Sequence, residues 1–170
     1  TLQREPAENP GELSNLGQLA EQLQQSLWQS LRGLLSINPD AKLQQAAQLL
    51  HQAGQILLAG SAHSAVVAAD MQNRLLELGK LALFHSDPAL SLQLARTLPP
   101  GSVVMLISDS GENADLLKLE LYARKRQLKI ISLTRFQTSA QSAVADITLF
   151  TLDTETDERL VRLITQQSQQ

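Results

Sequence analysis

Cysteine is missing from the 170-residue chain. Its absence excludes disulfides, thiolate zinc sites, iron–sulfur clusters and cysteine nucleophiles. The 3 histidines, His51, His63 and His85, stand far apart in the sequence, so no metal site is expected. Aromatic residues make up only 3% of the chain, which argues against a flavin site, and no cofactor is expected.

Long apolar runs are missing as well. No run approaches the ~20 residues that a membrane-spanning helix requires, and the N-terminus has no signal-peptide pattern. A net charge of −3 and an isoelectric point near 5.6 argue against a domain that wraps nucleic acid by itself. The basic run Arg124-Lys125-Arg126 fits the end of a helix, where cations complement the helix dipole. A soluble, cytoplasmic protein without a membrane partner is expected.

The chain opens with a polar segment, residues 1–12, whose prolines and glycine give it the composition of a linker. This opening favours a piece cut from a longer protein. Residues 13–36 carry apolar side chains at steps of three and four, which predicts one helix with an apolar stripe. The stripe either packs on the core of its own domain or pairs with a helix of a partner subunit. Its members are Leu13, Leu16, Ala20, Leu23, Leu27, Leu31 and Leu34.

From residue 37 onward, short apolar runs alternate with amphipathic stretches of helical length. The run Asn38-Pro39-Asp40 predicts an N-cap and a first-turn proline for a helix that ends near Gly54. The predicted strands are 55–59, 81–85, 103–107, 129–133 and 147–152. The helix predicted after the first strand ends near 79, and the next helices cover 88–98, 112–127 and 139–145. A last helical stretch follows the fifth strand. The strands are continuously apolar, as strands covered on both faces require. The sequence therefore predicts a doubly wound α/β fold, with a five-stranded parallel sheet of flavodoxin-like order 2-1-3-4-5.

The loops that follow the first and third predicted strands are small and rich in hydroxyl groups. They cover residues 60–64 (GSAHS) and 108–113 (SDSGEN), each directly before a helix. Because the two strands are neighbours in the predicted order, the loops face one crevice at the carboxyl edge of the sheet. Serine hydroxyls, backbone N–H groups and helix N-termini together suit a phosphate monoester. The predicted ligand-binding residues are Gly60, Ser61, His63, Ser64, Ser108, Ser110, Gly111 and Asn113.

The serines also have a simpler explanation, because Ser64, Ser108 and Ser110 fit helix caps and turns. Other anion-binding patterns are missing. The first loop lacks the G-x-G-x-x-G pattern of dinucleotide sites, and no P-loop string occurs. No acidic pair follows the first strand, as a phosphoacceptor domain would need.

Several motifs stand in order along residues 40–157. They are Ile56–Ser64, Asp70–Gly79, Asp87, Val103–Gly111, Ile130–Thr134 and Ala145-Asp146, of which the S-x-S-G string at residues 108–111 is the most specific. Together they resemble the sugar isomerase (SIS) domain, in particular the effector domain of RpiR-type transcriptional regulators. This resemblance implies a phosphosugar bound between Ser64 of the first loop and the serines and glycine of S-x-S-G. Two positions depart from the family pattern: Ala62 replaces a common glycine, and Asn113 a common threonine.

The resemblance implies a sensor rather than an enzyme. Residues 37–170 would form the phosphosugar-binding domain, whose last helix, beginning near Glu155–Arg159, stops sooner than in the family. RpiR-type regulators read DNA through a helix-turn-helix domain, which is expected to be absent from this chain. The expected assembly is a homodimer or higher homo-oligomer, in which the ligand shifts the DNA-competent population.

Two other functions stay open. A phosphosugar aldose–ketose isomerase on the same fold needs a general base within reach of the substrate, and the candidates are Glu77, Glu112, His63 and His85. A solvated surface charge explains Glu77, the helix dipole explains Glu112, and a ligand contact or loop packing explains His63. The remaining alternative is a scaffold whose pocket is unused and which only dimerises through the apolar stripe of residues 13–36.

Overall fold

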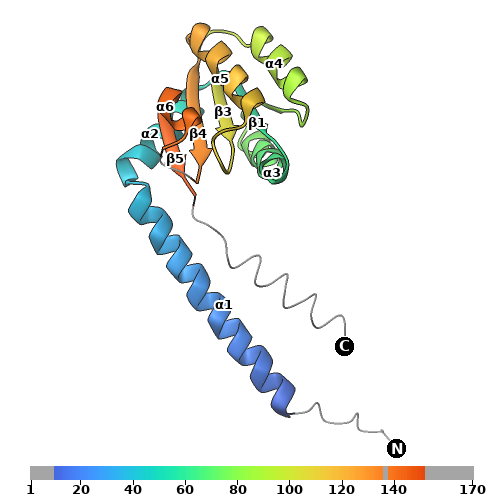
Figure 1. Ribbon diagram of the computed structural model, residues 1–170, viewed down its shortest axis with the longest axis vertical. Helices are drawn as coiled ribbons and strands as arrows, with labels where there is room; N and C mark the ends of the chain where they lie inside the picture. Colours follow the sequence, from blue (N-terminus) through green and yellow to red (C-terminus); the bar gives the residue numbers. More distant parts are fainter. Residues whose placement is uncertain (1–9, 136–137, 152–170) are drawn as a thin grey trace, which may run out of the picture. The chain divides into compact units, whose positions relative to one another are not determined.

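The computed structural model describes residues 10–135 and 138–151 of the chain. Leu35–Thr151 forms one compact unit, and most of the first helix belongs to a second unit. The larger unit contains a sheet flanked by helices (Figure 1). The helical stretch predicted after the last strand lies outside the described residues.

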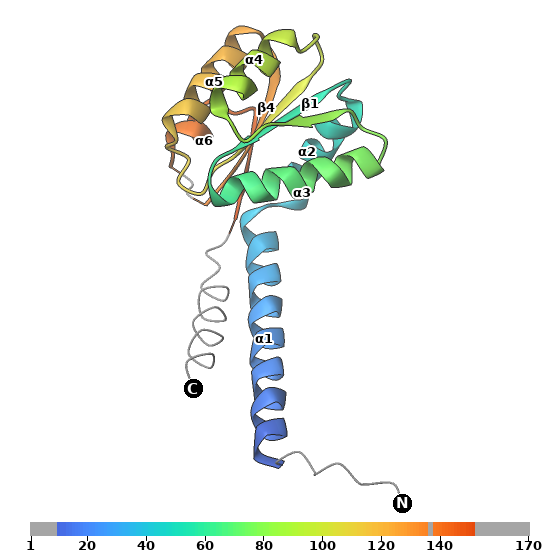
Figure 2. The ribbon, with the colours of Figure 1, turned by 90° about the vertical axis from the view of Figure 1, so that its right-hand side faces the viewer.

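The first helix, α1 (Pro10–Ile37), is uninterrupted (Figure 2). It takes in the end of the predicted linker, because proline suits the first position of a helix. Apolar side chains in its second half are exposed, to 60% for Leu27, 59% for Trp28 and 55% for Leu31. This part of the stripe is therefore not buried in a core, and its pairing with a partner subunit stays a prediction. No helix in the described part of the chain is both long and apolar enough to cross a bilayer.

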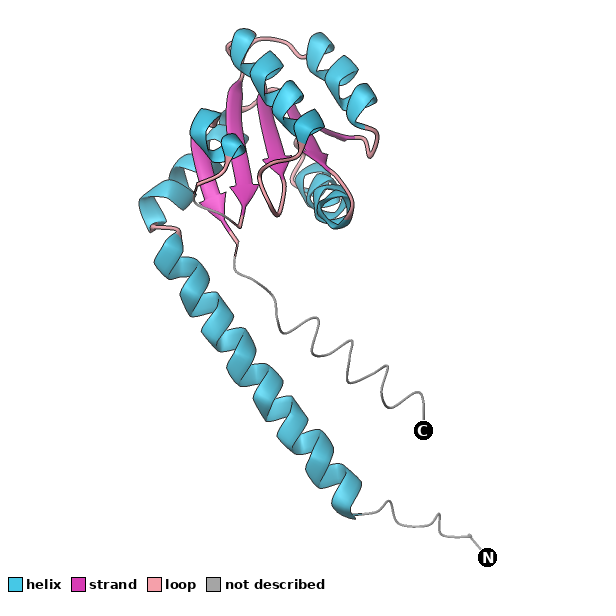
Figure 3. Cartoon of the chain, viewed as in Figure 1, coloured by secondary structure: helices cyan, strands magenta, loops and turns pink. Residues whose placement is uncertain are grey.

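Five strands form one sheet in the order β2-β1-β3-β4-β5, and all neighbours are parallel (Figure 3). The strands are β1 (Ile56–Gly60), β2 (Ala82–Phe84), β3 (Val103–Ile107), β4 (Lys129–Thr134) and β5 (Ile147–Phe150). The predicted parallel sheet and its order are confirmed. Gly60 is in register with Ile107, and Ile107 with Leu133, so the loops after β1, β3 and β4 leave the same edge of the sheet.

Helices cover both faces of the sheet, which is why the strands are apolar on both sides. The helices of this unit are α2 (Asp40–Gln52), α3 (His63–Glu77), α4 (Pro88–Thr97), α5 (Ala114–Lys125) and α6 (Ala140–Val144). On β1, Ile56 and Leu58 belong to the core shared with α2 and α3. Leu57 and Ala59 belong to the core shared with α4 and α5. The fold is therefore doubly wound, as predicted.

The strands β1 and β3 are neighbours, but the helices that follow them, α3 and α5, cover opposite faces of the sheet. In open parallel sheets, ligands bind in the crevice at the carboxyl ends of two such strands. The topology thus places the two hydroxyl-rich loops at the preferred binding position of this fold.

The open edge of β5 is covered at one residue by a side chain. The buried amide group of Asn38 donates to the Phe150 carbonyl oxygen and accepts from the Phe150 N–H, both at 2.8 Å. The predicted cap is therefore wrong: the N-cap of α2 is Pro39, whose side chain makes no cap hydrogen bond. Instead, the Asn38 amide takes the hydrogen bonds that a neighbouring strand would supply.

Candidate functional site

The loop after β1 leaves the strand in a tight turn. A Cβ on Gly60 would lie 2.6 Å from the Ser64 carbonyl oxygen, so only glycine fits there. The Ser64 N–H donates to the Ser61 carbonyl oxygen at 3.0 Å as α3 begins. Ala62 has φ 50° and ψ −124°, a backbone conformation that favours glycine. The first loop is therefore strained at the residue that departs from the family pattern.

The serines of the loop after β3 form turns, as their simpler explanation requires. Ser108 Oγ accepts from the Gly111 N–H at 3.1 Å, and Ser110 Oγ accepts from the Glu112 N–H at 3.2 Å. Ser108 is buried and Ser110 is exposed. Among the described residues, no acceptor is found for either hydroxyl hydrogen. Both hydroxyls therefore have a donor left for a ligand.

Ser64 does not cap α3. The N-cap is Ala62, whose methyl side chain cannot accept a cap hydrogen bond. The half-buried Ser64 hydroxyl has no hydrogen-bond partner in the described ranges, and its neighbour His63 is exposed. The simpler explanation, which holds for the serines after β3, thus does not explain Ser64.

Asn113 joins the two loops. Its Oδ1 accepts from the N–H groups of Asp115 and Leu116, both at 3.1 Å, and so caps α5. Its Nδ2 donates to Ser61 Oγ at 3.0 Å. The loops after β1 and β3 are therefore in direct contact.

The loop after β3 is also bonded to β4 and α6. The Asp109 carbonyl oxygen accepts from the Arg135 N–H, and the Gly111 carbonyl oxygen accepts from the Gln141 N–H, both at 3.1 Å. A Cβ on Gly111, whose φ is +68°, would lie 2.4 Å from Ser139 Oγ. These contacts fix the S-x-S-G backbone from the side of β4 and α6.

Thr134, Arg135 and Ser139 contact this loop but are not among the predicted ligand-binding residues. Arg135 directly follows β4, at the same edge of the sheet as the two loops. That position was the available signal, because residues after parallel strands gather at one edge. Ser139 carries no comparable signal, since its contact with Gly111 depends on how α6 folds back.

Two carboxylates of the loop after β3 are held on the side away from β1. Asp109 Oδ2 accepts from Arg135 Nη2 at 2.8 Å, next to β4. Glu112 Oε1 accepts from the Ala140 N–H at 2.7 Å, at the start of α6. The sheet order places β4 across β3 from β1, so neither carboxylate is directed at the first loop.

The four candidates for a general base are in different positions. Glu77 ends α3, about 20 Å from the start of that helix at 1.5 Å per residue. The Glu112 carboxylate binds the start of α6. His85 follows β2, and its Nδ1 accepts from the Asp87 N–H at 3.0 Å. Of the four, His63 is the one next to the loop after β1, since it is the first residue of α3, and it is exposed.

A buried carboxyl group lies behind the site, on α5. Glu120 is 0% exposed, and neither of its carboxylate oxygens has a hydrogen-bond partner within the described part of the chain. Burial raises the pKa of Glu120 to about 7, although Arg124 opposes this shift. Glu120 stands in the middle of the helix, two turns after the Asn113 cap, and outside the loops. Nothing in the sequence pattern singled it out.

The arginines of the basic run have structural partners. The Arg126 guanidinium donates to the carbonyl oxygens of Arg96 and Leu98, at 3.0 and 3.1 Å, and so ties the end of α5 to the end of α4. Arg124 Nη1 lies 3.4 Å from Asp146 Oδ1. These contacts agree with the interpretation of the run as a helix end.

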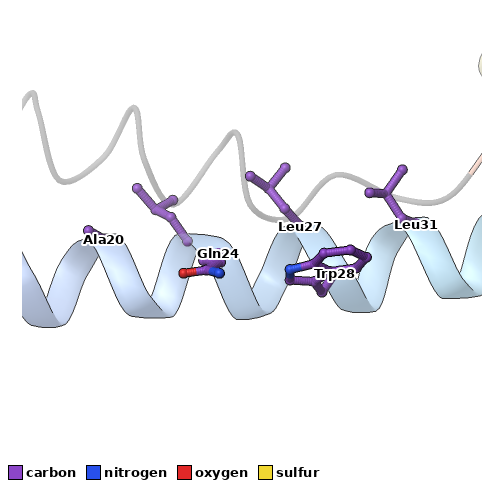
Figure 4. A pocket seen from close by; sticks show the side chains of 6 residues that line it. Ala20, Gln24, Leu27, Trp28 and Leu31 are labelled. Atoms are coloured by element: carbon purple, nitrogen blue, oxygen red, sulfur yellow. The ribbon is translucent and has the colours of Figure 1, made fainter.

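Two hollows lie elsewhere on the described residues. One, of about 360 Å³, is on α1 and is lined by Ala20, Leu23, Gln24, Leu27, Trp28 and Leu31 (Figure 4). The other, of about 290 Å³, is lined by residues of α2, α6 and β5. Neither includes residues of the two loops. In the same ranges, no three His, Asp or Glu side chains gather in a way that could hold a metal.

The family model of the SIS domain matches residues 49–168. The uncharacterized HTH-type transcriptional regulator YbbH of Bacillus subtilis is 32% identical over 121 residues, which are 71% of this chain and 42% of the relative. The HTH-type transcriptional regulator RpiR of Escherichia coli K12 is 29% identical over 116 residues, or 68% of this chain and 39% of the relative. The chain thus spans about two fifths of the length of these relatives.

Solved structures of regulators and enzymes share the fold. The Vibrio vulnificus NanR protein complexed with ManNAc-6P has a TM-score of 0.73 at 25% identity, over 84% of this chain and 54% of that one. The phosphoheptose isomerase GmhA from Neisseria gonorrhoeae has a TM-score of 0.66 at 22% identity, over 88% of this chain and 95% of that one. The fold alone therefore does not separate a sensor from an isomerase.

Proposed function

The chain belongs to the SIS-domain family, and on that premise we propose that residues 37–170 are the phosphosugar-sensing effector domain of an RpiR-type transcriptional regulator. The curated relatives support a regulator, because both are HTH-type transcriptional regulators. The likeness to NanR in complex with ManNAc-6P supports a sugar phosphate as the ligand. The regulator acts in the cytoplasm as a homodimer or higher homo-oligomer, and a helix-turn-helix domain outside these residues binds the DNA.

The contact between the two hydroxyl-rich loops carries the proposal. Asn113 and Ser61 hold the loops together at 3.0 Å, where α3 and α5 begin. The hydroxyl groups of Ser64, Ser108 and Ser110 have hydrogens to donate, and the N-terminal ends of α3 and α5 favour negative charge. A phosphate monoester between the loops would accept these hydrogen bonds and be stabilised by both helix dipoles.

The remaining contacts follow from the same placement. Gly60 and Gly111 let the two loops turn tightly beside the ligand, because a Cβ would meet Ser64 or Ser139, and the exposed His63 contacts the polar part of the ligand. The proposed ligand-binding residues are Gly60, Ser61, His63, Ser64, Ser108, Ser110, Gly111 and Asn113. No catalytic residue is assigned, because the carboxylate of Glu112 is engaged with α6 and Glu77 stands at the far end of α3.

Ligand binding would regulate DNA binding through linkage. A ligand that binds one arrangement of the oligomer more tightly shifts the population toward that arrangement. Such coupling is typically worth about 1–3 kcal/mol, which changes operator affinity by roughly 5–150-fold.

Replacing Ser110 tests the site. Isothermal titration of the chain with a panel of sugar phosphates, ManNAc-6P among them, should identify a ligand that is bound and not converted. Ser110→Ala should then weaken binding by about 1–3 kcal/mol, because a hydrogen bond to a charged group is lost. Ser36→Ala, an exposed serine at the end of α1, is the matched control and should leave the affinity unchanged.

Three results would change the proposal. Equal affinity of Ser110→Ala and the unmodified chain would move the site elsewhere. Turnover of a bound aldose or ketose phosphate would show an isomerase. No binding of any sugar phosphate would leave a scaffold.

A further inference from the structure

The proposed anion site contains an acidic residue. Asp109 is the second residue of S-x-S-G, between Ser108 and Ser110, and its side chain is 64% exposed. Adjacent Cα atoms are about 3.8 Å apart, so this carboxylate starts within one residue of both proposed hydroxyl donors. Its negative charge opposes the binding of a phosphate dianion by the same loop.

Three contacts from the end of β4 hold Asp109, two made by Arg135 and one by Thr134. The Arg135 guanidinium lies 2.8 Å from Asp109 Oδ2, and the Arg135 N–H donates to the Asp109 carbonyl oxygen at 3.1 Å. The hydroxyl group of Thr134 donates to the same carbonyl oxygen at 3.3 Å. The backbone and the carboxylate of Asp109 are both fixed from the end of β4.

The direction of this pairing matters for the site. Arg135 follows β4, and β4 lies across β3 from β1. The ion pair therefore draws the Asp109 carboxylate toward β4, while the proposed ligand lies between the loops after β1 and β3. The Arg135 side chain is 29% exposed and the Asp109 side chain 64%, so solvent screens the carboxylate of this pair more than the guanidinium.

We infer that Arg135 is a positioning residue for the anionic ligand: it holds the Asp109 carboxylate away from the crevice and neutralises it, so that the S-x-S-G loop accepts a phosphate dianion. This inference rests on the proposed function. It adds a residue that does not touch the ligand but acts on it through Asp109.

Two substitutions and their combination test the inference. Binding of ManNAc-6P and of inorganic phosphate is measured by isothermal titration for Arg135→Gln, Asp109→Asn and the double variant. Arg135→Gln should weaken binding about threefold to tenfold, since one uncompensated charge then stands near the phosphate. The double variant should return to within about twofold of the unmodified chain, because the charge that Arg135 neutralises is gone. Asp109→Asn alone should bind as tightly as the unmodified chain, or more tightly.

Further variants separate charge from fold. Arg135→Lys keeps the positive charge and should keep most of the affinity, even if Arg135→Gln unfolds the loop. Arg124→Gln removes the arginine of another ion pair, with Asp146, and should not change binding. Raising the salt concentration should narrow the difference between Arg135→Gln and the unmodified chain.

The outcomes distinguish the two proposals. If the unmodified chain binds neither ManNAc-6P, nor another sugar phosphate, nor inorganic phosphate, the proposed function fails and the inference fails with it. If it binds, but Arg135→Gln binds equally well or the double variant stays weak, the inference alone is overturned. A loss of affinity in Asp109→Asn would likewise overturn it, because the carboxylate would then contact the ligand itself.

Discussion

The loops after β1 and β3 are joined by the hydrogen bond from Asn113 to Ser61 but are held in different ways. The loop after β3 is fixed from behind by Arg135 and by the Gln141 N–H, and its Gly111 packs closely on Ser139. The loop after β1 turns through Ala62, whose φ of 50° is unfavourable for an L-residue. The loop after β3, the fixed wall of the site, is thus set before a ligand binds. The loop after β1, the strained wall, carries backbone strain.

This difference shows how binding energy is divided in the site. A preorganised wall binds an anion without first being ordered, so little of the binding energy is lost there. In the loop after β1, a ligand that favoured another conformation of Ala62 would also release its backbone strain. We therefore expect any ligand-dependent movement to occur in the loop after β1.

The largest predicted effect is the loss of the fixed wall. Gly111→Ala would place a Cβ 2.4 Å from Ser139 Oγ and 2.9 Å from Thr134 Oγ1, at a φ of +68°. Crowding and the left-handed backbone together should lower the free energy of unfolding by about 3–5 kcal/mol, measured by urea denaturation. Gly101→Ala is the matched control, because Gly101 has φ +81° and nothing within 4 Å. A loss no larger than that of the control would contradict the packing of Gly111.

The second effect tests the helix behind the fixed wall. The pKa of Glu120 is about 7 in the folded protein against an ordinary value of 4.5, so the unfolded chain loses this proton first as pH rises. Stability should fall between about pH 4.5 and 7 and level off above. Glu120→Gln cannot ionise and should raise the free energy of unfolding by about 2 kcal/mol at pH 8, with little change at pH 4.

Urea denaturation at both pH values measures this difference. Glu77→Gln, which replaces an exposed carboxylate at the end of α3, is the matched control and should change the free energy of unfolding at pH 8 by less than Glu120→Gln does. An equal effect of Glu120→Gln at pH 4 and pH 8 would mean that the buried carboxyl does not titrate in this range.

The smallest effect concerns the strained wall. Ala62→Gly should raise the free energy of unfolding by about 1 kcal/mol, because the left-handed cost exceeds the extra entropy of glycine in the unfolded chain. Gln127→Gly, at a φ of 56° beyond the end of α5, should be stabilising to a similar degree. Of the two, only Ala62→Gly should also change sugar-phosphate affinity. Destabilisation by Ala62→Gly would show that the Ala62 side chain outweighs its strain.

The sheet could be predicted from the sequence because its signal is local. The strands are apolar on both faces, and the predicted run 103–107 has the same bounds as β3. The edge strand β2 is shorter than predicted, Ala82–Phe84 rather than 81–85, and its flanking residues Leu81 and His85 are exposed. The contact between the two loops could also be predicted, because it follows from the order of these strands in the sheet.

The rest depends on contacts that no local pattern encodes. Asp109 pairs with Arg135, 26 positions further along the chain. The burial of Glu120 depends on the tertiary packing around α5. Whether the apolar stripe of α1 is buried depends on whether a partner binds it. Asn38 shows most clearly what a local pattern cannot predict. The pattern predicted a helix cap, but the Asn38 side chain bonds Phe150, 112 positions further along the chain.

The Asn38 side-chain amide pairs with the edge of β5 as one residue of a sixth strand would. Edge strands with free backbone groups recruit other chains, and such a plug makes sheet-to-sheet joining at Phe150 unfavourable. The same two hydrogen bonds join Asn38, which directly follows α1, to the last residue of β5, so these two residues move together. A shift of β5 on ligand binding would therefore be transmitted directly to the base of α1.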